Sequence, residues 1–292
     1  EEPLKSLGAE ISTNNSFLPI EIKGPLSGGK VKVDGSISSQ FLSGLLIALP
    51  LAEEDSLVEV NSLQSKPYVD MTLEIIEHFG VSIENHNYKN FIIKGKRDYI
   101  AKDYTIEGDW SAAAFHLVAA AIAGSSKIGN LNLKSKQADI KILDAIKLAG
   151  ADIVFNNGNS KTMGSISINK NQLKAFNFDA THCPDLFPPL VVLCAACHGK
   201  SEIKGVDRLK HKESDRASVL KEEMAKIGIQ IEISGNSMIV SGGKIKSATI
   251  NSNNDHRIAM AASVAALISD NGISIEGAEA INKSYPEFFD DL

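Results

Sequence analysis

The hydrophobic and polar positions of this chain follow one pattern that recurs four times. In each copy an apolar-periodic helix ends at a glycine, and a small or apolar residue, a polar residue and an isoleucine then begin a strand. The glycines are Gly8, Gly80, Gly150 and Gly228, roughly 70 to 80 residues apart. Glycine after a helix adopts the left-handed conformation that turns the chain. One such cap is common, but four at a near-constant spacing indicate a repeated structural unit.

The rest of the unit also repeats. After the cap come two short strands, a third strand, a polar loop and an apolar helix rich in small residues, which we expect at 39–51, 111–123, 184–197 and 256–267. A further strand, a second polar loop and a second helix complete the unit. We expect the third strands at 30–33, 104–107, 175–178 and 247–250. The unit is therefore β-α-β-α-β-β, and the predicted fold class is α/β.

Both polar loops of a unit precede helices, whose N-termini cap well with Ser, Asp and Asn and also bind anions. The loops at 107–111 and 135–139 are typical of plain caps. The loops at 212–216 and 254–257 differ because they add cations to the capping residues. Only four of the 30 basic residues are arginine, and two of the four lie in these loops. Since the planar guanidinium suits carboxylates and phosphates, we expect an anion-binding site here.

Composition narrows the function classes. The chain has 292 residues, 43% of them hydrophobic and 23% charged, with a net charge of −6. The length fits two domains or one large domain, the composition is typical of a globular protein, and the net negative charge argues against nucleic-acid binding. No apolar run approaches the roughly 20 residues of a membrane span, and the N-terminus lacks a signal-peptide pattern. We therefore expect a cytoplasmic protein without membrane or nucleic-acid partners.

The three cysteines, Cys183, Cys194 and Cys197, do not suggest a disulfide framework, because their number is odd. Residues 194–198 match the c-type haem attachment pattern by letter. However, 189–197 is typical of a buried helix, in which free cysteine packs as a small hydrophobic residue. We expect these cysteines in the core. We expect no cofactor, because the sequence has no Walker motif, no dinucleotide-binding glycine turn and no zinc-ligand spacing.

Five segments resemble, in order and spacing, the 5-enolpyruvylshikimate-3-phosphate synthases (3-phosphoshikimate 1-carboxyvinyltransferases). They are 34–41 (DGSISSQF), 65–68 (SKPY), 184–185 (PD), 208–216 (RLKHKESDR) and 254–257 (NDHR). The resemblance implies two domains, each of three repeats around a pseudo-threefold axis in an inside-out α/β barrel, with the active site between them. Residues 1–101 would be the remainder of the N-terminal, shikimate-phosphate-binding domain, and 102–292 most of the C-terminal domain.

The implied reaction transfers the enolpyruvyl group of phosphoenolpyruvate to the 5-hydroxyl of shikimate 3-phosphate and releases phosphate, a step of chorismate and aromatic amino acid biosynthesis. By the same resemblance, Asp185 would take the hydroxyl proton and Glu213 would deliver a proton to the methylene carbon. Such chemistry needs one proton acceptor, one donor and cations for two anions. The partners would be these two small molecules, and we expect a monomer.

The resemblance also assigns binding residues. Those implied for shikimate 3-phosphate are Ser38, Ser39, Gln40, Ser65, Tyr68, Asp185, Arg208 and Lys212. Those implied for phosphoenolpyruvate are Gln40, Arg216, Arg257 and Lys283, with the two arginines on the carboxylate and the lysine on the phosphate.

Two motifs of the family are absent from the sequence: a Lys-Ser-x-x-x-Arg segment and an Asn-Ala-Gly-Thr loop, both upstream in its members. The family has six repeats, whereas about four are present here. We therefore expect that roughly the N-terminal third is missing, and that the 292-residue chain alone turns over slowly or not at all.

Two alternatives remain open. The UDP-N-acetylglucosamine enolpyruvyl transferases share the architecture, although the Lys-Glu-Ser-Asp-Arg and Ser-Ser-Gln segments favour the shikimate enzyme. A non-catalytic α/β-repeat binding protein would explain the glycine caps and the capping residues. It would not explain why scarce arginines and carboxylates collect in equivalent loops.

Overall fold

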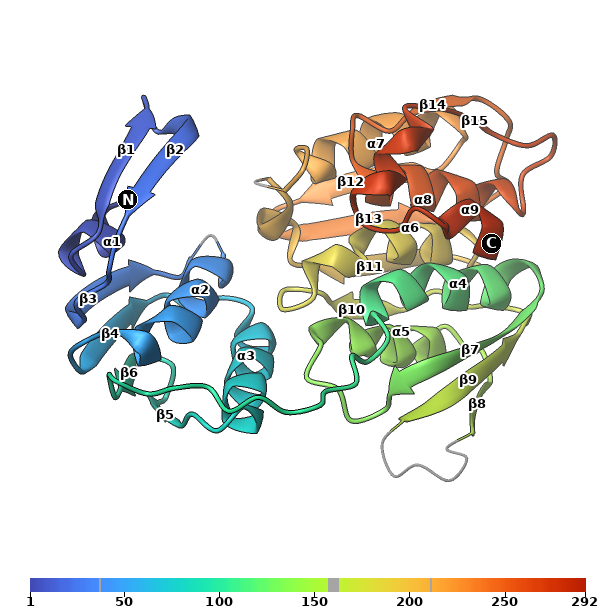
Figure 1. The fold of residues 1–292 in the computed structure, drawn as a ribbon. Helices are drawn as coiled ribbons and strands as arrows, with labels where there is room; N and C mark the ends of the chain where they lie inside the picture. Colours follow the sequence, from blue (N-terminus) through green and yellow to red (C-terminus); the bar gives the residue numbers. More distant parts are fainter. Residues whose placement is uncertain (37, 157–162, 211) are drawn as a thin grey trace. The chain divides into compact units, whose positions relative to one another are not determined.

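The computed structural model describes residues 1–36, 38–156, 163–210 and 212–292. The chain divides into two compact units, Glu1–Thr105 and Ile106–Leu292 (Figure 1). Both units are built from the repeat that the hydrophobic pattern predicts, so the predicted α/β fold class is confirmed.

The first unit contains one complete repeat. Its elements are β3 (Gly29–Asp34), α2 (Gln40–Ala48), β4 (Ser56–Asn61), α3 (Lys66–His78), β5 (Ile83–His86) and β6 (Asn90–Ile93). The sheet order is β3-β4-β6-β5. Strands β3 and β4 are parallel, as the crossover through α2 requires, and β6 is antiparallel to both of its neighbours. Both α2 and α3 begin where a parallel strand ends, so their N-termini share one edge of the sheet.

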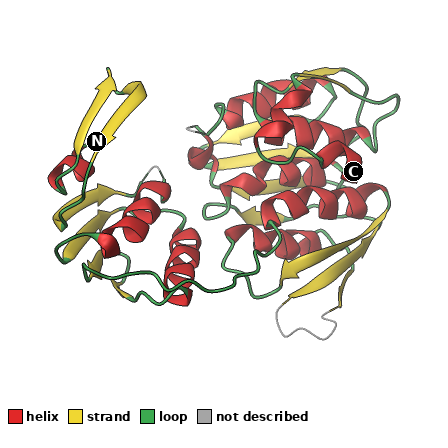
Figure 2. Ribbon diagram, viewed as in Figure 1, coloured by secondary structure: helices red, strands yellow, loops and turns green. Residues whose placement is uncertain are grey.

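A helix and a hairpin precede this repeat. They are α1 (Glu2–Ser6), β1 (Glu10–Asn14) and β2 (Phe17–Lys23). The two strands form a separate antiparallel ribbon, which stands apart from the four-stranded sheet of the unit (Figure 2). Every residue of β2 is exposed, including Phe17 and Leu18.

The second unit contains three repeats. The first has α4 (Trp110–Ala123), β7 (Ser125–Asn132), α5 (Ile142–Leu148), β8 (Ile153–Asn156) and β9 (Met163–Asn169). The second has β10 (Asn177–Asp179), α6 (Phe187–Ala195), β11 (Lys200–Lys204), α7 (Arg216–Lys226), β12 (Gln230–Ser234) and β13 (Ser237–Ser241). The third has β14 (Thr249–Asn251), α8 (His256–Ala266), β15 (Ser274–Glu276) and α9 (Phe288–Asp291). Short 3-10 turns, η2 (Ala138–Lys141), η3 (Pro184–Leu186), η4 (Val206–Leu209) and η5 (Ala278–Lys283), lie in the loops.

The prediction of a strand at 104–107 is wrong, because these residues form no strand. They belong to the connection between the two units, and Ile106 is 78% exposed. The chain instead meets β7 through a hydrogen bond from the Gly108 amide to the Asn130 carbonyl, 2.7 Å. An alternating pattern alone does not form a strand when no neighbouring edge is available to pair with it.

The core of the second unit lies among α4, α6 and α8, which pack against one another (Figure 1). All nine residues of α6 are buried. The three cysteines are free and buried, as the sequence predicts, and burial raises the pKa of each thiol. The helices of the described ranges include none that is long and apolar enough to cross a bilayer.

Candidate active site

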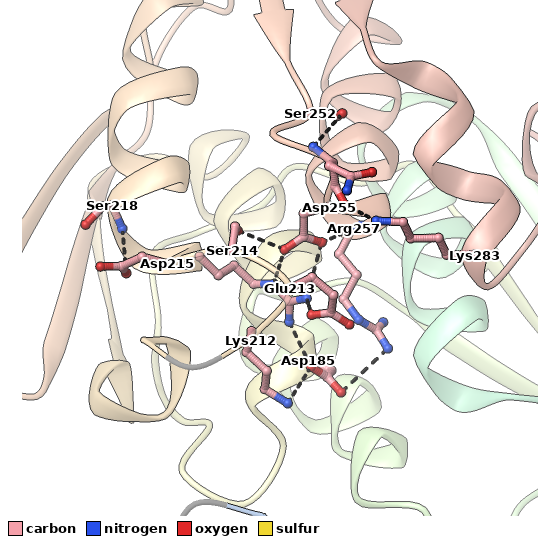
Figure 3. A network of polar contacts seen from close by, with 12 residues as sticks. Asp185, Lys212, Glu213, Ser214, Asp215, Ser218, Ser252, Asp255, Arg257 and Lys283 are labelled. Carbon is pink, nitrogen blue, oxygen red and sulfur yellow. Dashed lines mark hydrogen bonds and ion pairs between the residues drawn. The ribbon is translucent and has the colours of Figure 1, made fainter. Parts of the chain in front are cut away.

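Three loops of the second unit bring their charged residues together at the N-termini of α6, α7 and α8 (Figure 3). Asp185 lies in the 3-10 turn before α6. Lys212 and Glu213 lie in the loop before α7, and Asp255 is the N-cap of α8. The charged side chains near the N-termini of these three helices therefore form one cluster.

Arg216 is the centre of this cluster and is completely buried. Its Nε donates to Asp255 Oδ2 at 2.9 Å, and its Nη1 donates to Asp185 Oδ1 at 2.8 Å. Its Nη2 donates to the Glu213 carboxylate and to Asp255 Oδ1. A buried guanidinium requires such partners because its desolvation is costly. Arg216 is therefore the internal counter-ion of three carboxylates from three loops.

Asp185 contacts two further cations, both less buried than Arg216. Lys212 Nζ lies 3.0 Å from Asp185 Oδ1, and Arg257 Nη2 lies 3.6 Å from Oδ2. Burial alone would raise the pKa of Asp185, but the charges of Arg257, Lys212 and Arg216 outweigh it and hold that pKa well below its ordinary value. The carboxyl group is therefore ionised.

Arg257 and Lys283 are held near the N-terminus of α8. Arg257 Nη1 donates to the hydroxyl of Ser111, at the start of α4, and its Nε finds no hydrogen-bond partner among the described residues. Lys283 Nζ donates to the Asn254 carbonyl at 2.6 Å (Figure 3). A buried N–H without a partner is uncommon, so the hydrogen bonds of Arg257 are incomplete among the described residues.

His256, beside Arg257, is buried, and neither ring nitrogen has a hydrogen-bond partner within the described ranges. Burial, assisted by the charge of Arg257, lowers the pKa of His256, so that the ring is neutral near pH 7. Neither His256 nor the two residues that hold the arginines, Ser111 and Asp255, was assigned a role from the sequence. Asp255 appeared there only as a member of the segment 254–257, and its ion pair with Arg216 was not predicted.

Arg208 lies in the 3-10 turn that follows β11 and is half-buried. Burial lowers the pKa of its guanidinium, and the charge of Asp185 opposes this shift. Arg208 therefore belongs to the electrostatic surroundings of the cluster. Seven predicted site residues thus lie in the second unit: Asp185, Arg208, Lys212, Glu213, Arg216, Arg257 and Lys283.

The other predicted residues lie in the first unit, at the N-termini of α2 and α3. Ser39 is the N-cap of α2, and the Gln40 amide donates to Ser38 Oγ at 3.1 Å. Ser65 is the N-cap of α3, with a positive φ of 52°, and its carbonyl accepts from the Tyr68 amide. The side-chain hydroxyls of Ser43 and Thr72 link the two helices, 2.9 Å apart. The five predicted residues of this unit, at 38–40, 65 and 68, therefore lie along one edge of its sheet. The dipoles of the two helices favour an anion there.

Comparison with known proteins identifies the family. The family model of EPSP synthase (3-phosphoshikimate 1-carboxyvinyltransferase) matches residues 1–292. This chain belongs to the EPSP synthase family. The resemblance drawn from the five sequence segments is thereby confirmed.

Several EPSP synthase relatives are similar over almost the whole chain. The 3-phosphoshikimate 1-carboxyvinyltransferase of Methanosarcina acetivorans is 40% identical over 296 residues, which cover 99% of this chain and 68% of the relative. That of Clostridium novyi is 38% identical and covers 98% of this chain and 65% of the relative. The chain thus spans about two thirds of the length of the relatives that it matches.

Solved structures agree on the fold. The EPSP synthase of Acinetobacter baumannii superposes with a TM-score of 0.81 at 26% identity and covers 99% of this chain and 68% of that one. The enolpyruvyl transferase NikO of Streptomyces tendae superposes with a TM-score of 0.74 at 14% identity, over 100% of this chain and 69% of that one. The second likeness concerns the fold alone.

Proposed function

We propose that this protein transfers the enolpyruvyl group of phosphoenolpyruvate to the 5-hydroxyl of shikimate 3-phosphate and releases phosphate. One observation supports the proposal beyond family membership. Asp185 forms ion pairs with Lys212, Arg216 and Arg257. Glu213 forms an ion pair with the same Arg216 guanidinium. Two carboxylates and several cations in one cluster are the groups that this reaction requires. The same activity appears in the names of the similar relatives.

The reaction has two stages, and each needs proton transfer. In the first, the 5-hydroxyl oxygen bonds to C2 of phosphoenolpyruvate while its proton passes to the Asp185 carboxylate, and the methylene carbon gains a proton from Glu213, which enters this stage protonated and released from its ion pair with Arg216. In the second, the methyl group returns a proton to Glu213 while the C2–O bond to the phosphate breaks, which restores the double bond, and the departing phosphate takes the proton from Asp185. Both residues return to their starting protonation states, so the cycle balances.

Asp185 must become a better base than it is in the ligand-free site, where its low pKa makes it a weak proton acceptor. Lys212 and Arg257 provide the change, because they are partly exposed, at 25% and 12% of the side chain. When these cations bind the anionic groups of the substrates, they stabilise the Asp185 carboxylate less. Its pKa then rises toward the range in which a carboxylate accepts a proton efficiently.

The cations also divide between the two substrates. We assign Arg257 to the phosphoenolpyruvate carboxylate and Lys283 to its phosphate, since both lie beside the α8 N-terminus. Arg216 is assigned to the same carboxylate by resemblance, but it is fully buried and already bonded to three carboxylates. A direct contact between Arg216 and the substrate therefore requires one of these ion pairs to open.

For shikimate 3-phosphate, we assign the hydroxyls of Ser38, Ser39 and Ser65 to the phosphate, supported by the N-termini of α2 and α3. Gln40 and Tyr68 would contact the ring, with Gln40 also near the enolpyruvyl donor. The remaining residues in this assignment, from the second unit, are Asp185, Arg208 and Lys212.

The proposal extends to the organisation of the protein. We assign residues 1–101 to the N-terminal domain and 102–292 to the C-terminal domain of a cytoplasmic monomer, which works on these two small molecules. We also propose that the 292-residue chain by itself is inactive or very slow. A normal rate of phosphate release by this chain alone would contradict that statement.

The test is a steady-state assay of phosphate release by the protein at its full encoded length. Release should require shikimate 3-phosphate and phosphoenolpyruvate together. Shikimate 3-phosphate should also raise the melting temperature, whereas UDP-N-acetylglucosamine should not. Release that depends on the UDP-sugar would establish the related transferase instead. A protein that neither releases phosphate nor responds to either ligand would be the non-catalytic repeat protein.

A further inference from the structure

The segment after β15 is attached to α4 by a cluster of aromatic rings. The ring centroids of His116 and Phe288 are 5.3 Å apart, and Tyr285 lies 5.6 Å from each of them. Phe288 is completely buried and also meets Phe115 edge-on at 6.1 Å. Tilted and edge-to-face rings at these separations attract one another. We call His116, Tyr285 and Phe288 the aromatic anchor.

The aromatic anchor is directly connected to Lys283. The amides of Ser284 and Tyr285 both donate to the Ile281 carbonyl, at 3.0 and 2.8 Å, which makes a tight turn around Lys283. The packing of Tyr285 against His116 of α4 therefore sets the position of the Lys283 backbone. The Lys283 side chain in turn reaches the Asn254 carbonyl, immediately before the N-cap of α8. The anchor thus fixes one cation of the candidate active site from outside it.

His116 is an unusual choice for this position. Its Nε2 is buried and has no hydrogen-bond partner among the described residues, although phenylalanine could fill the same space without an unpaired polar atom. Burial lowers the pKa of His116, and the charged group that opposes this shift is Asp291 on α9. Asp291 also accepts a hydrogen bond from the Tyr285 hydroxyl at 2.5 Å, so this carboxylate acts on two members of the anchor, and Glu287 is a second carboxylate whose charge acts on Tyr285.

We propose that His116 is a positioning residue, which holds Lys283 at the site through Tyr285 and Phe288 and releases this hold when the imidazole is protonated. The proposal rests on the proposed function only in the assignment of Lys283 to the phosphate of phosphoenolpyruvate. A neutral imidazole packs among the rings, whereas an imidazolium carries charge on the buried Nε2, which has no hydrogen-bond partner among the described residues. Because the folded state favours the neutral form, the anchor is fully formed above the ordinary value of 6.5 and weakens as the pH falls below it.

The first test uses amide hydrogen exchange in the 292-residue chain and needs no substrate. His116→Phe keeps the ring packing and removes the titration. After correction for intrinsic rates, Ser284 and Tyr285 should be equally protected in both proteins at about pH 7.5, and about threefold less protected in the wild type at about pH 5.5. The Val219 amide on α7, which donates to Asp215, is the internal control and should not differ. An unchanged ratio of protection at the two pH values would overturn the proposal.

The second test measures steady-state kinetics of the protein at its full encoded length. Lowering the pH should raise KM for phosphoenolpyruvate about threefold more in the wild type than in His116→Phe, while kcat and KM for shikimate 3-phosphate change equally in both. The difference should vanish in a Lys283→Ala background, because His116 acts through that lysine. Equal KM profiles despite the expected exchange result would contradict the link to Lys283. Absence of any turnover would instead contradict the proposed function, and the exchange test alone would then decide the positioning role.

Discussion

Two equivalent loops in successive repeats of the second unit, 135–139 and 212–216, differ in the charge of their side chains. In the first repeat, Gln137 donates to the Glu107 carboxylate at 2.8 Å and to the Gly108 carbonyl at 3.0 Å, and it accepts from the Trp110 amide. Ser135 completes this network by donating to Glu107. In the next repeat the same position carries Lys212, Glu213 and Arg216. The first loop forms neutral hydrogen bonds and bonds to one carboxylate in residues 107–110, whereas the second places cations beside a carboxylate.

The comparison shows that the repeated scaffold does not itself create the site. Both loops precede a helix, and from the first helix onward both repeats have the order helix, strand, helix, strand, strand, so the difference lies in a few side chains. We call the loop network of Glu107, Ser135 and Gln137 the closed network, and the ion pairs of Asp185, Glu213, Arg216 and Asp255 the charged cluster. Variants of these two groups separate structural from functional roles.

The largest effect is expected from Arg216→Met. This change removes the counter-ion of three carboxylates, two of which are mostly buried, and should lower the free energy of unfolding of the second unit by about 3–5 kcal/mol. Urea denaturation followed by circular dichroism measures it. A loss below about 1 kcal/mol would show that Arg216 does not stabilise the charged cluster.

The next effect concerns the two N-caps. Asp255 and Asp109 accept from the backbone amides of Arg257 and Ser111, two residues further along each helix. Asp109→Ala loses only the cap and should cost about 1 kcal/mol. Asp255→Ala also removes an ion pair with buried Arg216, so it should cost at least about twice as much.

The pH dependence distinguishes these two caps further. Burial alone would raise the pKa of Asp255, but the charge of Arg216 outweighs it and places that pKa below its ordinary value of 3.8. The stabilisation is therefore present above pH 3.8 and is lost as the pH falls through the lower folded-state value. Unfolding free energies measured between about pH 2 and 5 should fall less steeply in Asp255→Ala than in the wild type. Identical slopes would mean that the ion pair contributes no stability.

The smallest effect on activity is expected from Gln137→Ala in the closed network. Three hydrogen bonds are lost in a half-buried position, which should cost about 1–3 kcal/mol. At the full encoded length, kcat/KM should stay within about threefold of the wild type, because no proposed substrate contact is removed. A larger loss of activity with normal stability would assign a catalytic task to the closed network.

The sequence predicts the parts of this structure that depend on local rules. Gly80, Gly150 and Gly228 all have positive φ, as expected for helix caps, and the helix expected at 256–267 is observed at His256–Ala266. It does not predict contacts between distant loops. The pairing of Arg216 with Asp255 joins residues 39 positions apart, and that of Arg257 with Ser111 joins residues 146 apart. The sequence therefore predicted that Arg216 contacts a ligand, whereas in the structure its guanidinium is paired with three carboxylates of the protein.

Burial is another property that the local pattern did not determine. Helices α2 and α6 are similarly apolar, yet only Leu42, Leu45 and Leu46 of α2 are buried, while all of α6 is. Phe41 and Ile47 of α2 are 69% and 51% exposed. A repeat buries its helix fully only when neighbouring repeats cover it, as α4 and α8 cover α6.

The central claim is that the charged cluster performs the chemistry, and Asp185→Asn tests it most directly. The substitution keeps the shape of the side chain and removes the proton acceptor. In the protein at its full encoded length, kcat for enolpyruvyl transfer should fall by about 10²–10⁴-fold, while Gln137→Ala remains near the wild type. Asp185→Asn turning over within a few-fold of the wild type would contradict the account.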